Sequence, residues 1–224
     1  MSKIGFLTDS CSDIPQELAD KYGIEVVGFP INLDGVEYME RKDFTNDQFY
    51  QMMRDAQGVP TTAAITQLQF CDIYARYADE GYTDLVYLSI NAGGSSTYNN
   101  AVKAMELLEE ERPGYTMKIQ VIDSHTYSMP YGWYFCECAR KVRNGGELAA
   151  CVAELKQKLD FLQENVDRVR AEMRKLTVEY RDLEAGDRNA QGIIEARRQE
   201  IASLELSEEV LDLSAAGNYL AVLY

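Results

Sequence analysis

Strand-like and helix-like segments alternate along the first 159 residues, and this alternation leaves few folds open to the chain. Short apolar runs suited to buried strands are separated by longer segments with helical spacing of apolar residues. The strand-like runs cover 4–8, 24–29, 85–90 and 119–122, and the helical segments cover 13–21, 46–56, 67–79, 95–111, 131–143 and the region from 147 onward. A repeated strand-then-helix order predicts an α/β fold with a parallel sheet wrapped by helices.

One β-hairpin is predicted inside this region. Asp34-Gly35 separates residues 30–33 from residues 36–39, and both flanking runs contain apolar residues. An Asp-Gly pair between two such runs is typical of a two-residue turn, because that turn requires positive φ at its central positions.

The residues after 159 have a different composition and a different period. Residues 160–224 contain no proline, and apolar residues recur in alternating steps of four and three where this region begins. The apolar positions are Leu155, Leu159, Leu162, Val166, Val169, Met173, Leu176, Tyr180 and Leu183. Such a heptad seam with charged flanks is typical of a coiled coil or a long bundle helix. We therefore expect two domains, an α/β domain at 1–159 and an α-helical tail at 160–224.

Two arrangements of the tail are compatible with this pattern. Residues 186–189 predict a break in the helix, after which a weaker apolar seam continues. The tail then either folds back as a helical hairpin or pairs with a second chain as a coiled coil. A third short helix is predicted from Ser207 to about Gly217. The apolar residues 219–224 are expected to dock against the rest of the protein.

The charge balance excludes one class of partner. The chain has 22 basic and 37 acidic residues and a formal net charge of −15, which repels a phosphate backbone and argues against non-specific nucleic-acid binding. No apolar run approaches the roughly 18–20 residues needed to span a bilayer, and the first ten residues lack the features of a signal peptide. Five cysteines, an odd number in a chain of this size, predict reduced thiols and a cytoplasmic location.

Small polar residues cluster where the predicted strands end, in segments 8–13, 91–97 and 123–126, and also at Thr61-Thr62. In an open parallel sheet, ligands bind beyond the carboxyl ends of the strands, so these segments are expected to meet. Glycines before a helix start, as in Gly93-Gly94-Ser95-Ser96, leave backbone N–H groups beside hydroxyls and favour an anion such as carboxylate or phosphate. Ordinary helix capping is the alternative interpretation of each cluster taken singly.

No catalytic constellation stands out in these loops. The chain lacks a Gly-x4-Gly-Lys phosphate loop and a Gly-x-Gly-x-x-Gly nucleotide motif. His125 is the only histidine, so a Ser-His-Asp hydrolase would need Ser95, His125 and Asp9, whose spacing selects no such geometry. Cys136 and Cys138 have one intervening residue and no matching second pair, unlike a zinc site. We expect no catalysis, no metal site and no cofactor, and keep the hydrolase as an alternative.

Several short motifs follow one another in a fixed order. Residues 8–15 read T-D-S-C-S-D-I-P, residues 95–101 read S-S-T-Y-N-N-A, and residues 121–124 read V-I-D-S. Residues 22–27, Asp34-Gly35 with Glu37-Tyr38, and Pro60-Thr61-Thr62 fall between these motifs. In this order they resemble the N-terminal domain of the DegV family of bacterial fatty-acid-binding proteins, over residues 1–159.

The resemblance implies that the ligand is one long-chain fatty acid. In the family the carboxylate is held by hydroxyls of two loops, which correspond here to Thr62 and Ser95. The other candidate ligand-binding residues are Thr61, Ser96, Asp9, Ser10 and Ser124. The resemblance further implies a cytoplasmic carrier, not an enzyme, that presents the acid to a separate fatty-acid kinase. That kinase makes acyl phosphate.

The sequence departs from the family pattern in two ways. Ala63 and Ala64 stand where the family has Ser and Gln, Ser96 stands where it has Gly, and Pro130 follows Met129 where Gly is usual. The family continues into a second α/β domain, and none of its motifs follows Leu159 in this chain. The tail stands in its place, and we expect its apolar face to cover the acyl chain.

An interaction protein is the alternative function. In that hypothesis the α/β domain is a vestigial scaffold, and the heptad seam drives homodimerisation or binds a partner helix.

Overall fold

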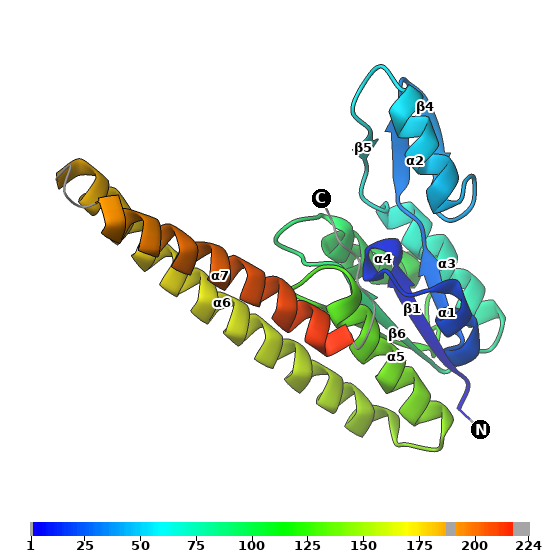
Figure 1. The fold of residues 1–224 in the computed structure, drawn as a ribbon. Helices are drawn as coiled ribbons and strands as arrows, with labels where there is room; N and C mark the ends of the chain where they lie inside the picture. Colours follow the sequence, from blue (N-terminus) through cyan, green and yellow to red (C-terminus); the bar gives the residue numbers. More distant parts are fainter. Residues whose placement is uncertain (1, 187–190, 217–224) are drawn as a thin grey trace. The chain divides into compact units, whose positions relative to one another are not determined.

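The computed structural model describes residues 2–186 and 191–216, and the side chains of 2–182 and 192–204. The chain divides into two compact units, Met1–Lys156 and Gln157–Tyr224. The first unit has the predicted α/β fold, and the second is helical (Figure 1).

The first unit is built on a four-stranded parallel sheet. Its strands are β1 (Ile4–Asp9), β2 (Ile24–Val27), β6 (Asp84–Ser89) and β7 (Lys118–Asp123). Their order is β2-β1-β6-β7, and each neighbouring pair is parallel. The carboxyl ends of the strands therefore share one edge, where the loops after β1, β6 and β7 lie close together.

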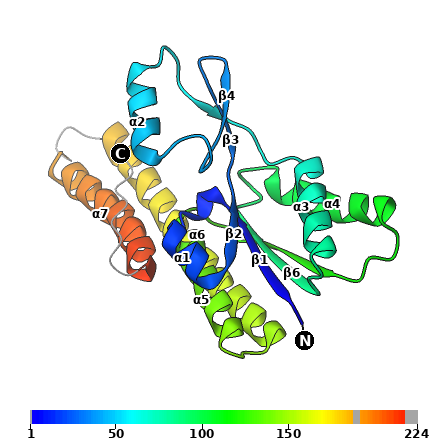
Figure 2. The same cartoon turned by 90° about the vertical axis from the view of Figure 1, so that its right-hand side faces the viewer.

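Helices cover both faces of this sheet (Figure 2). On one face α1 (Gln16–Tyr22) packs with α5 (Met129–Arg143), and on the other α3 (Gln67–Asp79) packs with α4 (Thr97–Glu111). A short 3-10 helix, η1 (Ser10–Ser12), leads out of β1. The predicted order of strand and helix is thus confirmed.

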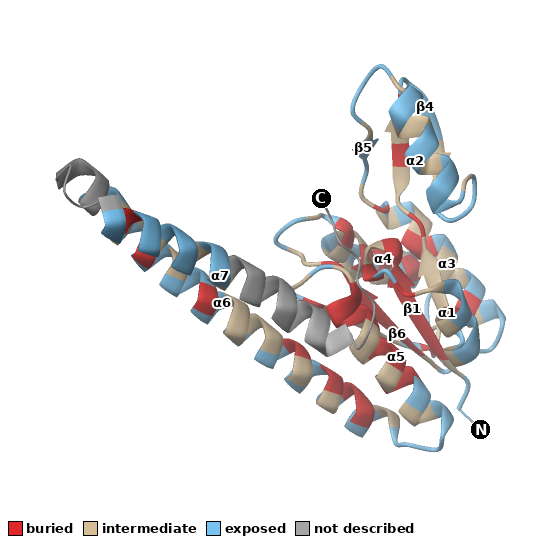
Figure 3. Ribbon diagram, in the orientation of Figure 1, coloured by how far each residue is buried: buried red, intermediate tan, exposed pale blue. Residues whose placement is uncertain are grey.

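Successive residues of β1 point to opposite faces of the sheet. Phe6 contacts Phe135 of α5 edge-to-face, with ring centroids 5.7 Å apart. Leu7 is fully buried in a cluster that includes Phe70 and Tyr74 of α3. Both faces of the strand are therefore buried (Figure 3), as expected for a parallel sheet between two helical layers.

A second, antiparallel sheet with the order β4-β3-β5 belongs to the same unit. β3 (Pro30–Leu33) and β4 (Val36–Met39) form the predicted hairpin, and both turn residues have positive φ. β5 (Thr61–Thr62) pairs with the other edge of β3, after α2 (Asn46–Asp55). The sequence did not indicate β5, because a strand of two residues is too short to show alternation.

The second unit is a helical hairpin. α6 (Leu148–Gly186) continues into it from the first unit, and α7 (Gln191–Ala216) runs back beside α6 (Figure 1). The hydroxyl oxygen of Tyr180 on α6 accepts hydrogen bonds from Nη2 and Nε of Arg198 on α7, at 2.7 and 3.0 Å. Of the two predicted arrangements, the chain adopts the hairpin. Val169 and Leu176 of the predicted seam are buried.

The structure corrects one expectation about the tail. A separate third helix was predicted from Ser207, but α7 continues without interruption through Ser207 to Ala216. A serine is a moderate helix former as well as a good N-cap, so helix-forming neighbours on both sides let the helix continue. The predicted break at 187–189 and the apolar residues 219–224 lie outside the described residues. Across 2–186 and 191–216, no helix is both long and apolar enough to cross a membrane.

Candidate functional site

A cavity of about 570 Å³ lies in the first unit, at the carboxyl edge of the parallel sheet. It is bounded by the segments that follow β1 and β6 and by the small antiparallel sheet. Phe29, Ile31 and Ile90 give it an apolar wall. Its polar lining residues are Ser10, Thr62, Ser95 and Ser96, together with Cys11, Asp13 and Glu40.

Thr62 reaches the cavity through the pairing of β5 with β3. Thr62 pairs with Ile31, and the Ala63 N–H donates to the Pro30 carbonyl at 3.0 Å. This pairing fixes the segment that contributes Thr62, Ala63 and Ala64 to the cavity. Side chains alternate across a strand, and Thr61, the other residue of β5, does not line the cavity.

Ser95 lies just before α4 and contacts the first residue of that helix. Its Oγ accepts a hydrogen bond from the Thr97 N–H at 3.3 Å and lies 2.9 Å from the Thr97 Oγ1. Thr97 is fully buried, so it fixes the position of the Ser95 hydroxyl. Ser96 is the N-cap residue of α4, but its side chain makes no capping hydrogen bond. Ser95 therefore contacts the helix start and also lines the cavity.

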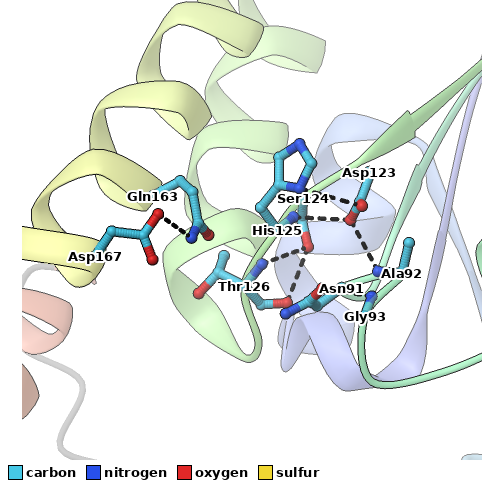
Figure 4. A network of polar contacts seen from close by, with 9 residues as sticks. All are labelled: Asn91, Ala92, Gly93, Asp123, Ser124, His125, Thr126, Gln163 and Asp167. Atoms are coloured by element: carbon cyan, nitrogen blue, oxygen red, sulfur yellow. Dashed lines mark hydrogen bonds and ion pairs between the residues drawn. The ribbon is translucent and has the colours of Figure 1, made fainter. Parts of the chain in front are cut away.

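Asp123, the last residue of β7, holds the base of the loop that carries Ser95 (Figure 4). Its Oδ1 accepts hydrogen bonds from the Ala92 N–H at 3.0 Å and from the His125 N–H at 2.8 Å. One carboxylate oxygen thus joins the loop after β6 to the loop after β7. Asp123 is the third residue of the V-I-D-S motif at 121–124.

One further hydrogen bond joins the same two loops, and another lies within the loop after β7. The Asn91 N–H donates to the Thr126 carbonyl at 3.1 Å. Ser124 is fully buried, and its hydroxyl donates to the Thr126 carbonyl at 2.9 Å. Ser124 therefore shapes the loop and does not line the cavity.

Asp9 is fully buried at the end of β1. Its Oδ1 accepts a hydrogen bond from the Tyr131 hydroxyl at 2.7 Å. Its Oδ2 accepts from the Tyr87 hydroxyl at 3.0 Å and the Ile90 N–H at 2.7 Å. Burial raises the pKa of the Asp9 carboxyl above its ordinary value, and these donors only partly oppose the increase. Asp9 anchors the strand ends and does not line the cavity.

Ser10 lines the cavity, but its hydroxyl already has partners within the protein. It donates to Oε2 of Glu40 and accepts from the Phe29 N–H at 3.2 Å. Glu40 was not predicted as a site residue, because nothing in its local sequence distinguishes it from the other carboxylates of an acidic chain.

The cavity brings together four of the seven predicted binding residues, Thr62, Ser95, Ser96 and Ser10. The other three, Thr61, Asp9 and Ser124, do not line it. The apolar wall formed by Phe29, Ile31 and Ile90 was also not predicted as part of the site. Its only sequence signal was that these residues lie at or beside the ends of strand-like runs.

The three residues of the alternative hydrolase have separate partners. Asp9 binds two tyrosine hydroxyls, Ser95 contacts Thr97, and the Nδ1 of His125 lies 3.2 Å from Oδ2 of Asp123. Burial raises the pKa of the Cys11 thiol to about 11, so this thiol is protonated near neutral pH and a poor nucleophile. Among the described residues, no group of three or more His, Cys, Asp or Glu side chains is arranged to hold a metal ion.

Comparison with known proteins gives a consistent family match. The family model described as "Uncharacterised protein, DegV family" matches residues 3–161. A DegV domain-containing protein of Caldanaerobacter subterraneus subsp. tengcongensis is 31% identical over 145 residues, which cover 65% of this chain and 49% of that protein. The chain therefore spans about half the length of the relatives that it matches.

Solved structures share the fold of the first unit. A DegV family protein from Thermus thermophilus, described by its fatty acid binding, is 30% identical with a TM-score of 0.59, and the match covers 70% of this chain and 54% of that one. A stearic acid-binding protein from Eubacterium ventriosum is 26% identical with a TM-score of 0.61, covering 70% of this chain and 52% of that one.

Proposed function

The chain belongs to the DegV family, and from this premise we propose that it binds a long-chain fatty acid in the cavity of its first unit. The hydroxyls of Thr62 and Ser95 hold the ligand carboxylate, assisted by Ser96 and by backbone N–H groups at the start of α4. Thr61, Ser10, Asp9 and Ser124 support these groups from the adjoining segments.

One observation carries this proposal: Thr62 and Ser95 come from separate segments and line one cavity. A carboxylate accepts hydrogen bonds from hydroxyl and amide donors, and such charge-assisted bonds are stronger than neutral ones. The first turn of a helix also offers N–H groups without intrahelical partners, which favour an anion. The apolar side chains of Phe29, Ile31 and Ile90 suit the first methylenes of the acyl chain.

Burial of the acyl chain supplies most of the affinity. Each buried methylene contributes about 0.8 kcal/mol, so the length of chain that the protein covers decides how tightly the acid is held. The relatives from Thermus thermophilus and Eubacterium ventriosum are described as binding fatty acid and stearic acid. We extend this ligand class to the present chain.

The protein acts as a cytoplasmic carrier and not as a catalyst in this proposal. The cavity holds hydroxyls and a protonated thiol, and the hydrogen bonds of Ser95, His125 and Asp9 run to separate partners. A bound acid is then presented to a separate fatty-acid kinase.

Extraction of the purified 224-residue chain in organic solvent, followed by mass spectrometry, tests the proposal. We expect a long-chain fatty acid in near-stoichiometric amount, and less in the double variant Thr62→Val/Ser95→Ala. Thr116→Val is a suitable control, because Thr116 is exposed and precedes β7 at the opposite edge of the sheet. Absence of a co-purifying acid, together with no uptake of added palmitate, contradicts the proposal.

Homodimerisation through the tail is a second candidate function. Val178 on α6 and Ile193 on α7 are both 55% exposed, so the hairpin leaves apolar side chains in contact with solvent. A second copy of the hairpin offers the same kind of surface. Sedimentation equilibrium of the wild-type chain and of Val178→Glu tests this: a dimer that the substitution weakens supports it, and a wild-type monomer at high concentration contradicts it.

A further inference from the structure

A second row of residues with heptad spacing runs along α6 within the second unit. Its positions recur in alternating steps of four and three and are Asp160, Glu164, Asp167, Ala171, Arg174, Val178 and Arg181. Each precedes a residue of the apolar seam by two positions, which is about 200° around a helix. This outer row therefore lies on the side of α6 opposite the seam, and all of its residues are exposed.

The charges of the outer row are segregated by sign. Its first three positions are acidic, two of its last three are arginine, and Ala171 lies at its middle. Like charges four residues apart, as at Asp160 and Glu164, destabilise a helix that stands alone. Opposite charges from another molecule relieve this repulsion.

The charged side chains of the outer row have few partners in the described part of the chain. Asp167 accepts one hydrogen bond, from Nε2 of Gln163 at 2.9 Å. The other four form no side-chain hydrogen bond or ion pair with any described residue: Asp160, Glu164, Arg174 and Arg181. These groups are therefore available to a surface of complementary charge.

The basic end of the outer row borders a hollow of about 490 Å³. The described residues that line it are Arg170, Met173, Arg174, Thr177, Val178 and Arg181, and none of them is acidic. The two glutamates of this stretch pair elsewhere. Oε1 of Glu172 lies 3.7 Å from Nζ of Lys175, and Oε2 of Glu179 lies 3.6 Å from Nη2 of Arg197 on α7. The hollow therefore suits carboxylate side chains from a partner, because arginine binds carboxylates well.

We propose that two copies of the chain associate through their outer rows in an antiparallel, twofold-symmetric arrangement. This inference rests on the second candidate function, homodimerisation through the tail, and assigns it a surface and an orientation. Seven residues separate Asp160 from Asp167 and Arg174 from Arg181, so both pairs span about 10 Å of helix. When Ala171 lies beside the twofold axis, Asp160 faces the partner's Arg181 and Asp167 faces the partner's Arg174.

The antiparallel orientation pairs opposite charges, whereas a parallel pair in register does not. In the parallel pair, Asp160 faces the partner's Asp160 and Arg181 faces the partner's Arg181. Twofold symmetry makes each ion pair of the antiparallel dimer occur twice. The small side chain of Ala171 lets the helices approach closely at the axis, and Val178, which is 55% exposed, adds apolar surface on both sides of it.

Contacts between facing side chains, and not the net charge, decide this association. The formal net charge of −15 repels a second copy at long range. At physiological ionic strength, however, exposed charges more than about 8 Å apart are largely screened. Side chains that meet across the interface lie within this distance. Charge substitutions in the outer row therefore act mainly through the side chains that they face.

Sedimentation equilibrium of the full chain and of charge-reversed variants in about 150 mM NaCl tests the inference. Arg174→Glu/Arg181→Glu leaves only acidic charges in the outer row, and Asp160→Arg/Asp167→Arg leaves Glu164 as its single acid. Each double variant reverses every proposed ion pair from attraction to repulsion, so we expect each to weaken the dimer roughly 100-fold. The two change the net charge in opposite directions, so net charge cannot explain weakening in both.

Restoration of complementary charges is the decisive readout. The fourfold variant that combines both doubles exchanges the charges and should dimerise again, as should an equimolar mixture of the two doubles. Lys42→Glu/Lys103→Glu, at exposed lysines of the first unit, changes the net charge as the arginine double does and should behave as wild type. Circular dichroism verifies that each variant keeps its helix content.

The possible failures are distinguishable. A dimer that either double variant leaves intact, or one that neither the fourfold variant nor the mixture restores, overturns the inference and leaves homodimerisation through the tail standing. Equal weakening by Lys42→Glu/Lys103→Glu assigns the effect to net charge and overturns the inference as well. If the wild-type chain is a monomer at high concentration, the inference and the second candidate function fail together.

Discussion

The hydroxyl of Tyr131 donates a hydrogen bond at 2.7 Å to Oδ1 of Asp9, a residue 122 positions earlier in the chain. Both side chains are fully buried. The bond joins the end of β1 to α5 directly beneath the segment that contributes Ser10 and Cys11 to the cavity. The position of the cavity rim therefore depends on a buried carboxylate and its donors.

Tyr131→Phe removes one donor to this buried carboxylate and leaves the ring in place. Hydrogen bonds to charged groups contribute roughly 1.5–3 kcal/mol, so we expect the free energy of unfolding in urea to fall by about 2 kcal/mol. Tyr50→Phe, at a tyrosine that is 53% exposed, serves as the control. Equal stability of Tyr131→Phe and wild type contradicts the role assigned to this bond.

Asp9 also makes stability depend on pH. Its native pKa is raised above the ordinary value of 3.8, so between these two values the native state binds more protons than the unfolded state. The stabilisation that Asp9 provides relative to Asp9→Asn is then greatest below about pH 3.8 and decreases as the pH rises through the native pKa. Urea unfolding of both proteins from pH 4 to 8 measures this difference. If the free energy of unfolding of the wild type rises relative to that of Asp9→Asn as the pH increases, the pKa of Asp9 is not raised.

Ser128 has a backbone conformation that favours glycine, with φ 64° and ψ −160°. Its N–H donates to the Cys11 carbonyl at 2.9 Å, which holds this conformation next to the cavity. Residues in such regions of φ/ψ space carry a strain of about 1–3 kcal/mol. We therefore expect Ser128→Gly to be more stable than Ser128→Ala by about 1–3 kcal/mol, although both lose the hydroxyl. The reverse order in thermal unfolding would show that position 128 is not strained.

Asp123→Ala deprives the Ala92 and His125 N–H groups of their shared acceptor. The Ala92 N–H is partly buried and costs about 1–3 kcal/mol when it is left unsatisfied, whereas the exposed His125 N–H can bind water. The loop that carries Ser95 loosens. We expect a lower free energy of unfolding and palmitate affinity reduced about tenfold, with partial rescue in Asp123→Asn, which keeps Oδ1. Asp72→Ala, at an exposed position of α3, is the control. Unchanged palmitate affinity in Asp123→Ala would show that the hydrogen bonds of Asp123 do not affect ligand binding.

The parallel sheet could be predicted from sequence because its signal is local. The strands β1, β6 and β7 are short apolar runs followed by amphipathic helices, and this order admits few topologies. The place of Ser95 and Ser96 could be predicted in the same way, since the strand ends in such a sheet share an edge. The pairing of Thr62 with Ile31 could not be predicted, because it depends on an antiparallel contact between distant segments.

Glu40 and Asp9 illustrate what the sequence leaves open. A carboxylate in a chain with 37 acidic residues has no local mark that distinguishes a solvent-exposed group from a buried or cavity-lining one. Asp9 was expected near the ligand, and the structure gives its oxygens to Tyr87, Tyr131 and Ile90. Only the three-dimensional contacts distinguish these two roles.

Equilibrium binding of palmitate to the purified chain and to Thr62→Val, Ser95→Ala and Thr116→Val measures whether the two hydroxyls hold the carboxylate. We expect each of the first two substitutions to weaken binding about 10- to 100-fold, because each removes a hydrogen bond to a charged group, of about 1.5–3 kcal/mol. We expect Thr116→Val to bind as wild type. Equal affinity of all four proteins for palmitate would contradict the claim that the hydroxyls of Thr62 and Ser95 hold the carboxylate.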